Sequence, residues 1–347
     1  MFSRRMLSFI LALCLIISFS ACKDADNPAE IESTPQNSEQ VTEQAPAYIN
    51  PLTGEALDSA DKLGKKPVAF TINNVDVAQK VQSGVGDADI IFETEVEGGI
   101  TRLLAVFYDP AKIKTIGTIR SLRIVYSDIA CGLDAIMVHN GIDPAYCAPY
   151  VKTISLVRDS IGSAYSYREK NGLAYEHTLY SSGDRITKMY SDKKYSDMKG
   201  DTKWVSFEKD DKSATPTDAV CTSLKVPFSS SSVTNFTYDS EKNKYIRANS
   251  KNVPFTDCKT GEKELFTNVF VLKTTMSYYS NNYHRNISLS GGSGYYISGG
   301  GIKEIKWTKG SASDPFKFTT IDGAELKVNT GNSYVCIVND TKEISYE

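Results

Sequence analysis

Acidic and basic side chains recur close together in the first half of the chain. Glu93, Glu95 and Glu97 alternate along a stretch that is typical of a strand, so the pattern places their side chains on one face. Arg102 follows on a stretch predicted to pair with the first one. Carboxylates that face a guanidinium group form a site for a polar ligand. They form a structural ion pair, or a solvated face of the sheet, equally well.

Two arginines stand at the start of a predicted helix. Arg120 and Arg123 lie three residues apart where apolar residues recur at helical spacing over 121–130, so we expect both on one face. A helix N-terminus with guanidinium groups nearby favours a phosphate or carboxylate ligand. The alternative is a structural salt bridge from these arginines to Glu93 or Glu97.

Polar residues also follow two predicted strands. Asn73 and Asn74 come after the apolar stretch 68–72, and His139 and Asn140 come after 135–138. Ligands of α/β sheets bind at the carboxyl ends of the strands, so we expect these side chains at one edge, where they would form a polar cleft. His139 and His177 are suited to act as acid and base, or to serve as structural histidines. The candidate ligand-binding residues are therefore Asn73, Asn74, Glu93, Glu97, Arg102, Arg120, Arg123, His139, Asn140 and His177.

No motif in the sequence identifies a catalytic residue, a metal site or a cofactor. There is no His-Glu-x-x-His pair, and the glycine runs at 291–294 and 299–301 lack the Lys-Ser/Thr of a phosphate-binding loop, so we expect turns there. Five cysteines follow residue 22, and their spacing fits no zinc site: Cys131, Cys147, Cys221, Cys258 and Cys336. A disulfide between Cys131 and Cys147 and buried thiols are both compatible with the sequence.

The N-terminus carries the pattern of a bacterial lipoprotein signal. Arg4 and Arg5 precede the apolar run 7–17, and small residues end at Cys22, which is the position of a lipidated cysteine. We therefore predict a signal peptide over 1–21 and a lipid anchor, with palmitate or a similar acyl chain, on Cys22. Residues 22–47 are acidic and lack aromatic side chains, which predicts a disordered tether about 30 Å in reach. The protein is then expected on the bacterial cell membrane, facing outside the cytoplasm.

The remaining charge is balanced. Residues 23–47 carry six acids and one base, and Arg4 and Arg5 of the signal offset two of these charges. The formal net charge of −3 therefore arises before residue 48, and the rest of the chain has no basic excess. Binding to nucleic acid needs a basic surface, and none is indicated. The expected partners are the membrane, through Cys22, and an envelope ligand or protein.

The amino-acid composition and the hydrophobic periodicity differ between the two halves of the globular part. Strand stretches at 68–72, 90–96, 101–108 and 135–138 alternate with helix candidates at 121–130, 144–154 and 182–190, which predicts an α/β domain with a mixed sheet over 48–210. Residues 213–347 are rich in Thr, Ser, Tyr and Val without a helical period, which predicts a mainly β domain with its own core. Its aromatic residues suit either that core or a glycan-stacking surface, and they are Tyr278, Tyr279, Tyr283, Tyr295, Tyr296 and Trp307.

Several local sequences resemble one known family. They are 50–54 (Asn-Pro-Leu-Thr-Gly), 97–102 (Glu-Gly-Gly-Ile-Thr-Arg), 116–123 (Ile-Gly-Thr-Ile-Arg-Ser-Leu-Arg) and 138–141 (Val-His-Asn-Gly). These stretches resemble the YerB-like lipoproteins of bacteria, a family with a domain of unknown function. The resemblance implies an N-terminal and a C-terminal part and a place outside the cytoplasm. It implies no established reaction, substrate or catalytic residue.

Three functions remain open at this point. The first is a binding module for a polar or anionic ligand of the cell envelope, or for a protein partner. The second is an envelope hydrolase or transferase that uses His139 or His177 with an arginine-lined pocket. The third is a structural subunit of a membrane complex. The lack of a recognisable nucleophile, metal set or cofactor loop favours binding.

Overall fold

The computed structural model describes residues 48–208 and 214–347. The signal peptide, Cys22 and tether predicted over 1–47, and the domain boundary predicted near 210–213, lie outside these residues. No helix of the described part is long and apolar enough to cross a membrane.

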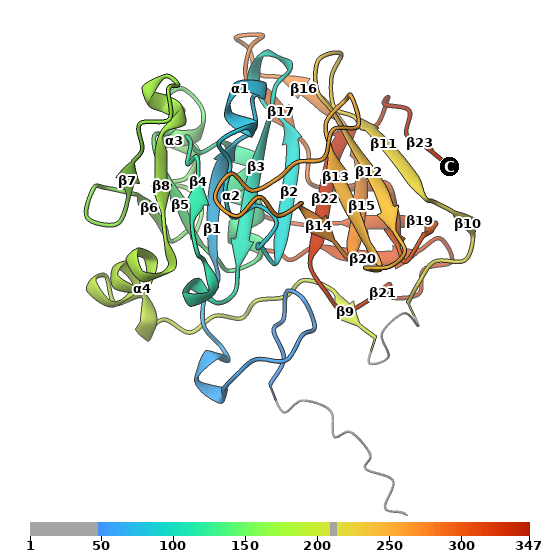
Figure 1. Ribbon diagram of the computed structural model, residues 1–347, viewed down its shortest axis with the longest axis horizontal. Helices are drawn as coiled ribbons and strands as arrows, with labels where there is room; N and C mark the ends of the chain where they lie inside the picture. Colours follow the sequence, from blue (N-terminus) through green and yellow to red (C-terminus); the bar gives the residue numbers. More distant parts are fainter. Residues whose placement is uncertain (1–47, 209–213) are drawn as a thin grey trace, which may run out of the picture. The chain divides into compact units, whose positions relative to one another are not determined.

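An eleven-stranded mixed sheet runs through both halves of the chain (Figure 1). Its strands, in spatial order, are β10 (Ala219–Val220), β19 (Gly301–Thr308), β18 (Gly291–Ser298), β15 (Asn268–Thr274), β22 (Ser333–Asn339), β2 (Ile90–Glu95), β3 (Thr101–Phe107), β1 (Val68–Asn73), β5 (Ile136–His139) and β6 (Arg158–Ser160), with β20 (Lys317–Thr320) paired to β19. The predicted strands at 68–72, 90–96, 101–108 and 135–138 are confirmed.

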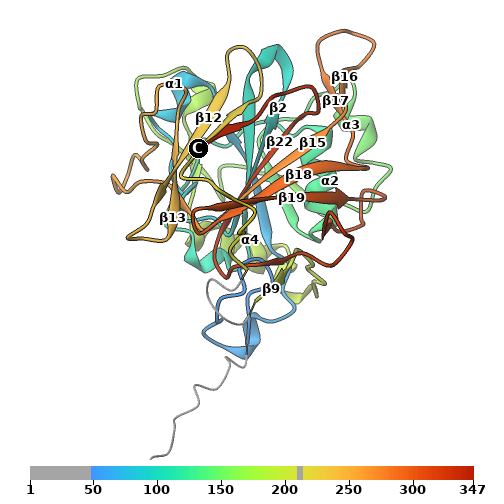
Figure 2. The same ribbon diagram turned by 90° about the vertical axis from the view of Figure 1, so that its right-hand side faces the viewer.

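A smaller antiparallel sheet packs on one face of the large one. It consists of β14 (Leu265–Phe266), β13 (Lys244–Ala248), β12 (Val233–Asp239), β11 (Ser223–Pro227) and β23 (Ser345–Tyr346). Phe236 and Phe266 of this sheet pack edge-on against Tyr334 of β22, with ring centroids 5.2 and 4.9 Å away. Figure 2 shows β12 and β13 on one side of the large sheet and α2 and α3 on the other.

The remaining strands form small sheets of two or three strands. They are β16 (Met276–Tyr278) with β17 (Arg285–Ile287), β21 (Lys327–Val328) with β9 (Ser206–Phe207), and β4 (Ile116–Gly117) with β8 (Leu179–Ser181) and β7 (Tyr167–Arg168). The glycine run at 299–301 forms the turn between β18 and β19, where Gly299 and Gly300 both have positive φ, as two-residue hairpin turns require. The turn prediction is therefore confirmed at 299–301. It is wrong at 291–294, because these residues form the start of β18 and pair with β19.

Helices are short and belong to the first half. The α-helices are α1 (Asp76–Gln79), α2 (Ile124–Gly132), α3 (Cys147–Tyr150) and α4 (Gly183–Asp192). The 3₁₀ turns are η1 (Ala60–Lys62), η2 (Glu97–Gly99), η3 (Pro110–Lys112), η4 (Tyr175–His177) and η5 (Tyr195–Asp197). The described residues from 214 onward form no helix. A mixed-sheet α/β N-terminal part followed by a mainly β C-terminal part is thus the observed architecture.

Two sequence-based expectations about helices are corrected. The helix expected at 144–154 is reduced to α3. The helix expected at 121–130 begins only at Ile124, because residues 119–122 are held extended. The amide of Arg120 donates to Thr71, and its carbonyl accepts from Asn140, so this segment is fastened between β1 and β5. Arg120 and Arg123 therefore do not share a helix face.

The expectation of a separate core in each half is wrong. β22, from the C-terminal half, pairs in parallel with β2 over five residue pairs, from Ile90↔Ser333 to Thr94↔Ile337. The cluster on each face of the sheet consequently draws side chains from both halves: Phe92 and Leu104 share one with Phe270 and Val335. All described residues belong to one compact unit.

Candidate functional site

One edge of the large sheet collects the candidate residues. β1, β5 and β6 pair in parallel, as do β2, β22 and β15, and β3 lies antiparallel between β1 and β2. All six strands therefore run in one direction and end at the same edge, which lies near α1 and the β16–β17 hairpin in Figure 1. The prediction that the ends of the strands at Ile72 and Val138 share an edge is confirmed. Two pockets open here, on either side of η2.

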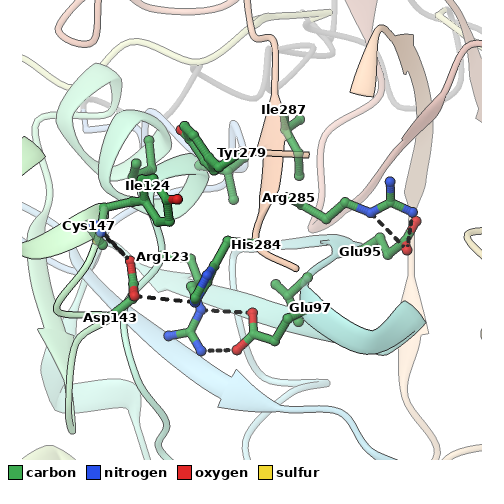
Figure 3. A pocket seen from close by; sticks show the side chains of 13 residues that line it. Glu95, Glu97, Arg123, Ile124, Asp143, Cys147, Tyr279, His284, Arg285 and Ile287 are labelled. Atoms are coloured by element: carbon green, nitrogen blue, oxygen red, sulfur yellow. Dashed lines mark hydrogen bonds and ion pairs between the residues drawn. The ribbon is translucent and has the colours of Figure 1, made fainter. Parts of the chain in front are cut away.

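The first, the charged pocket, lies between η2, the start of α2, α3 and the β16–β17 hairpin (Figure 3). Its ionisable side chains form pairs. Arg123 makes a two-pronged contact with Glu97, with Nε 2.9 Å from Oε2. The lining residues are Glu95, Val96, Glu97, Arg123, Ile124, Val125, Asp143, Tyr146, Cys147, Tyr279, His284, Arg285 and Ile287.

Two further pairs join the hairpin to this pocket. Arg285 Nε lies 2.9 Å from Glu95 Oε1, and His284 Nε2 lies 3.2 Å from Asp143 Oδ1. The rings of Tyr146 and Tyr279 stack with centroids 4.5 Å apart. The hairpin is thus fastened over the pocket, which retains only about 20 Å³ of space, enough for one water molecule.

Glu97 is the counter-charge of two arginines. Burial alone would raise the pKa of Glu97, but Arg123, and then Arg102, hold this pKa at about 2. Arg102 is buried, and its Nη2 lies 4.0 Å from Glu97 while its Nη1 donates to the carbonyl of Ser121 at 2.7 Å. Burial lowers the pKa of Arg102 to about 10, so it stays charged at neutral pH. Arg123 Nη1, the guanidinium nitrogen that does not contact Glu97, donates to the carbonyl of Leu122 at 2.9 Å. Each of the three guanidinium nitrogens of Arg123 therefore already donates to a partner within the chain.

The cysteine of this pocket is a thiol. Cys147 is fully buried, its Sγ lies 3.8 Å from Ser127 Oγ, and burial raises its pKa to about 11. A thiol in that state is a poor nucleophile at neutral pH. The five cysteines of the described chain are all free, so the Cys131–Cys147 disulfide is not formed; Cys258 is exposed and the other four are buried.

The second, the hydroxyl pocket, lies on the other side of η2 and holds about 330 Å³ of space. That volume is within the range of pockets that bind small ligands. Its lining combines hydroxyl and amide groups with an aliphatic wall, and no Lys, Arg or His of the described residues belongs to it. The lining residues are Asn74, Val75, Asp76, Val77, Gln79, Glu93, Ile100, Thr101, Ser231, Ser232, Val233, Thr234, Asn249 and Ser250.

A buried hydrogen-bond network forms the floor of the hydroxyl pocket. Glu93 is buried, and its carboxylate accepts four hydrogen bonds, from Asn74 and Thr101 at Oε1 and from Thr234 and Tyr334 at Oε2, at 2.6–2.8 Å. Behind it, the buried Arg247 donates to Asn74 Oδ1 at 2.9 Å and to Glu264 at 2.8 Å. Within the described residues the buried Nε of Arg247 has no hydrogen-bond partner, so the floor is held in place chiefly by the four bonds to Glu93.

The rim of the hydroxyl pocket is different, because its polar atoms are available. Within the described residues, the Asp76 carboxylate, Gln79 Oε1, Asn249 Nδ2 and the Ser250 hydroxyl have no hydrogen-bond partner. Asp76 and Ser250 are exposed. Donors and acceptors that still need partners are what a polar ligand requires.

The ten residues selected from the sequence fall into four places, and the single arginine-lined cleft expected from them is not formed. Asn74 and Glu93 belong to the floor of the hydroxyl pocket, and Glu97, Arg102 and Arg123 form the ion network beside the charged pocket. The alternating glutamates also separate, because β2 ends at Glu95 and Glu97 enters η2. The pair Arg123–Glu97 is the structural salt bridge that the sequence left open.

The other candidates gather around Glu176 or remain apart. His177 Nδ1 lies 2.6 Å from Asn73 Nδ2, and Arg120 Nη1 lies 3.3 Å from the carbonyl of Glu176. His139 is buried, its Nδ1 lies 2.7 Å from the carbonyl of Gly141, and burial lowers its pKa. Asn140 donates to Ile161 at 3.4 Å. Neither histidine lines the charged or the hydroxyl pocket.

Sequence reasoning missed most of the pocket-lining residues. Asp76 and Gln79 follow Asn74 at the end of a predicted strand, so extending that stretch by one turn would have included them. Asn249 and Ser250 come from the loop after β13, and no sequence pattern marks them as ligand-binding residues. Of the aromatic candidates, Tyr296 and Trp307 are core residues, whereas Tyr278 and Tyr283 are exposed on the hairpin. Among the described residues, no group of three or more His, Cys, Asp or Glu is arranged to hold a metal ion.

Comparison with known proteins agrees with this architecture. Residues 52–196 match the N-terminal domain, and residues 224–335 the C-terminal domain, of a protein family of unknown function, DUF3048. The chain belongs to the DUF3048 family. A curated relative in Bacillus subtilis (strain 168), the putative lipoprotein YerB, is 30% identical over an alignment of 318 residues that covers 88% of this chain and 90% of the relative.

A solved structure extends the family likeness to the fold. The crystal structure of YerB protein from Bacillus subtilis matches with a TM-score of 0.73 and 25% identity, over 86% of this chain and 99% of that one. The YerB-like family assignment made from the local sequences is therefore confirmed. The family is described as one of unknown function and the relative as a putative lipoprotein, so the argument for a function rests on the geometry of the pockets.

Proposed function

We propose that this protein is a lipid-anchored extracytoplasmic binding module whose hydroxyl pocket takes a hydroxylated, saccharide-type ligand of the cell envelope. The lipobox at Cys22 and a relative named as a putative lipoprotein support the location. The observation that carries the ligand class is the hydroxyl pocket itself, with its ligand-sized space, unpartnered polar rim and hydrogen-bonded floor.

A sugar ring suits this lining chemically. Its hydroxyl groups both donate and accept, which matches Gln79 Oε1, Asn249 Nδ2 and the Ser250 hydroxyl at the rim. Its C–H face is apolar, which matches the aliphatic wall of Val75, Val77, Ile100 and Val233. A preformed pocket avoids part of the ordering cost of binding.

The charged pocket favours recognition or structure over catalysis. Its acids and bases neutralise one another, and its thiol has a raised pKa. A general acid or base needs a pKa near the working pH and access to substrate. His139 is buried and its pKa is lowered, so the hydrolase or transferase alternative gains no support from this arrangement.

The test fills the pocket without touching its floor. Ser250→Trp places an indole in the hydroxyl pocket, and Ser240→Trp, at an exposed position outside it, is the matched control. Full-length protein is titrated with glucosamine oligomers, with N-acetylglucosamine oligomers and with solubilised peptidoglycan glycan by isothermal calorimetry. We expect binding by the wild type and by Ser240→Trp, and at least tenfold weaker binding by Ser250→Trp. No binding by the wild type, or equal affinities for all three proteins, would contradict the proposal.

A further inference from the structure

We infer that the hydroxyl pocket selects a saccharide carrying a free ammonium group, with Asp76 as the residue that recognises the charge. This inference rests on the proposed function and specifies its ligand. It starts from the ionisable side chains that line the pocket, which in the described part of the chain are the carboxyl groups of Asp76 and Glu93.

The two carboxylates play different parts. Glu93 has all its acceptor capacity engaged by Asn74, Thr101, Thr234 and Tyr334, so it cannot pair directly with a ligand. Its charge nevertheless stays beneath the pocket. Glu93, Glu264 and Arg247 are the buried charges of the floor network, and together they carry one net negative charge when all three are ionised.

Asp76 stands at the rim, where a ligand reaches it. It is exposed and has neither a hydrogen bond nor an ion pair to any other described residue. Gln79 Oε1, one helical turn away on α1, is also an unpartnered acceptor. An ammonium group has three donors and no acceptor, so a carboxylate and an amide oxygen side by side suit it well.

The same charges disfavour the anionic ligand that the arginines suggested from the sequence. Arg123 is paired with Glu97 in the charged pocket, and none of the described basic side chains lines the hydroxyl pocket, where it could stabilise a carboxylate or phosphate. A negative ligand would approach two like charges, whereas an amino sugar with a free amine would meet the opposite sign.

The experiment compares two oligomers of equal length and linkage, glucosamine and N-acetylglucosamine, which differ by acetylation of the amine. Calorimetric titrations at 150 mM salt use the full-length wild type, Asp76→Asn, and Asp184→Asn as an exposed control on α4. We expect the wild type and Asp184→Asn to bind the free-amine oligomer about tenfold more tightly. Asp76→Asn should reduce this preference to about twofold with little change for the acetylated oligomer.

The outcomes separate the two proposals. Equal affinities for both oligomers in the wild type, or an unchanged preference in Asp76→Asn, would overturn the charge selection while leaving saccharide binding intact. If Ser250→Trp still bound the free-amine oligomer, the oligomer would be binding outside the hydroxyl pocket. That result would also overturn the charge selection. If neither oligomer bound the wild type, both proposals would fall.

Discussion

The charged pocket and the hydroxyl pocket lie on either side of η2, yet they use their polar groups in opposite ways. In the charged pocket, Glu97, Arg123, Asp143 and His284 are engaged with one another, and about 20 Å³ of space remains. In the hydroxyl pocket the charged group, Glu93, is sealed into the floor. The rim leaves neutral and acidic groups available around about 330 Å³.

The difference concerns which side chains are left without partners. Arginine, glutamate and histidine are the residue types that most resemble a reaction centre. Here they fasten the β16–β17 hairpin to the end of β2 and to the loop before α3, and they fasten the start of α2 to η2. Serine, asparagine and glutamine line the space that a ligand can enter. Burial and pairing, rather than residue type, therefore distinguish the structural cluster from the binding surface.

Removing the central carboxylate of the charged pocket should give the largest effect on stability. Glu97→Gln leaves Arg123, and the buried Arg102, without their counter-charge. Breaking a buried pair on one side costs about 3 kcal/mol of unfolding free energy. Urea denaturation followed by circular dichroism measures this loss.

Glu176→Gln is the control for that substitution, because Glu176 is an exposed partner of Arg120. It should change the unfolding free energy by no more than about 0.5 kcal/mol. If the two variants were equally stable, the charged pocket would not be a structural cluster.

The stabilisation by Glu97 should depend on pH. Its pKa is about 2 in the folded protein against an ordinary value of 4.5, so the stabilisation is complete above pH 4.5 and is lost as the pH falls toward 2. After allowance for solvent screening, we expect the wild type to lose about 2 kcal/mol over this range relative to Glu97→Gln. Parallel urea titrations of both proteins at several pH values measure the difference. A gap between the two proteins that stays constant down to pH 2 would be incompatible with this pairing.

The stacking of Tyr279 in the hairpin on Tyr146 should contribute less to stability than the ion pairs of Glu97. Tyr279→Ala removes the stack on Tyr146, and we expect a loss of about 1 kcal/mol. Hydrogen exchange should become faster in residues 277–286, because the hairpin loses one of its contacts. Exchange as slow as in the wild type would mean that the ion pairs alone hold the hairpin.

Trimming the rim of the hydroxyl pocket should have the smallest effect on stability. Ser250 is exposed and its hydroxyl has no partner in the described part of the chain, so Ser250→Ala should change the unfolding free energy by less than about 0.5 kcal/mol. Thermal melts of wild type and variant measure this change. A loss above about 1 kcal/mol would place Ser250 in the structural network instead.

The sequence predicted local structure better than long-range pairing. The apolar stretches of the sequence located β1, β2, β3 and β5. Asn74 and Glu93 line a pocket at one edge of the sheet that these strands form. The parallel insertion of β22 beside β2 joins residues about 240 positions apart, and neither strand carries a local signal for its partner. Two separate cores were expected for that reason.

The site was harder to predict because partner choice is a tertiary property. Nothing in the spacing of Glu93, Glu95 and Glu97 indicates that Glu93 takes four donors while Glu97 takes an arginine. The rim of the hydroxyl pocket also depends on the loop after β13, which meets α1 only in the folded chain.

Saccharide affinity in reciprocal variants tests the division between the two pockets most directly. Isothermal calorimetry with a glucosamine oligomer would compare Glu97→Gln, Tyr279→Ala as a milder change in the charged pocket, and Ser250→Trp. We predict that both charged-pocket variants bind within twofold of the wild type, although they are less stable, and that Ser250→Trp binds at least tenfold more weakly, although it is as stable as the wild type. Lost binding in Tyr279→Ala, with unchanged binding in Ser250→Trp, would contradict the account and assign the ligand to the charged pocket.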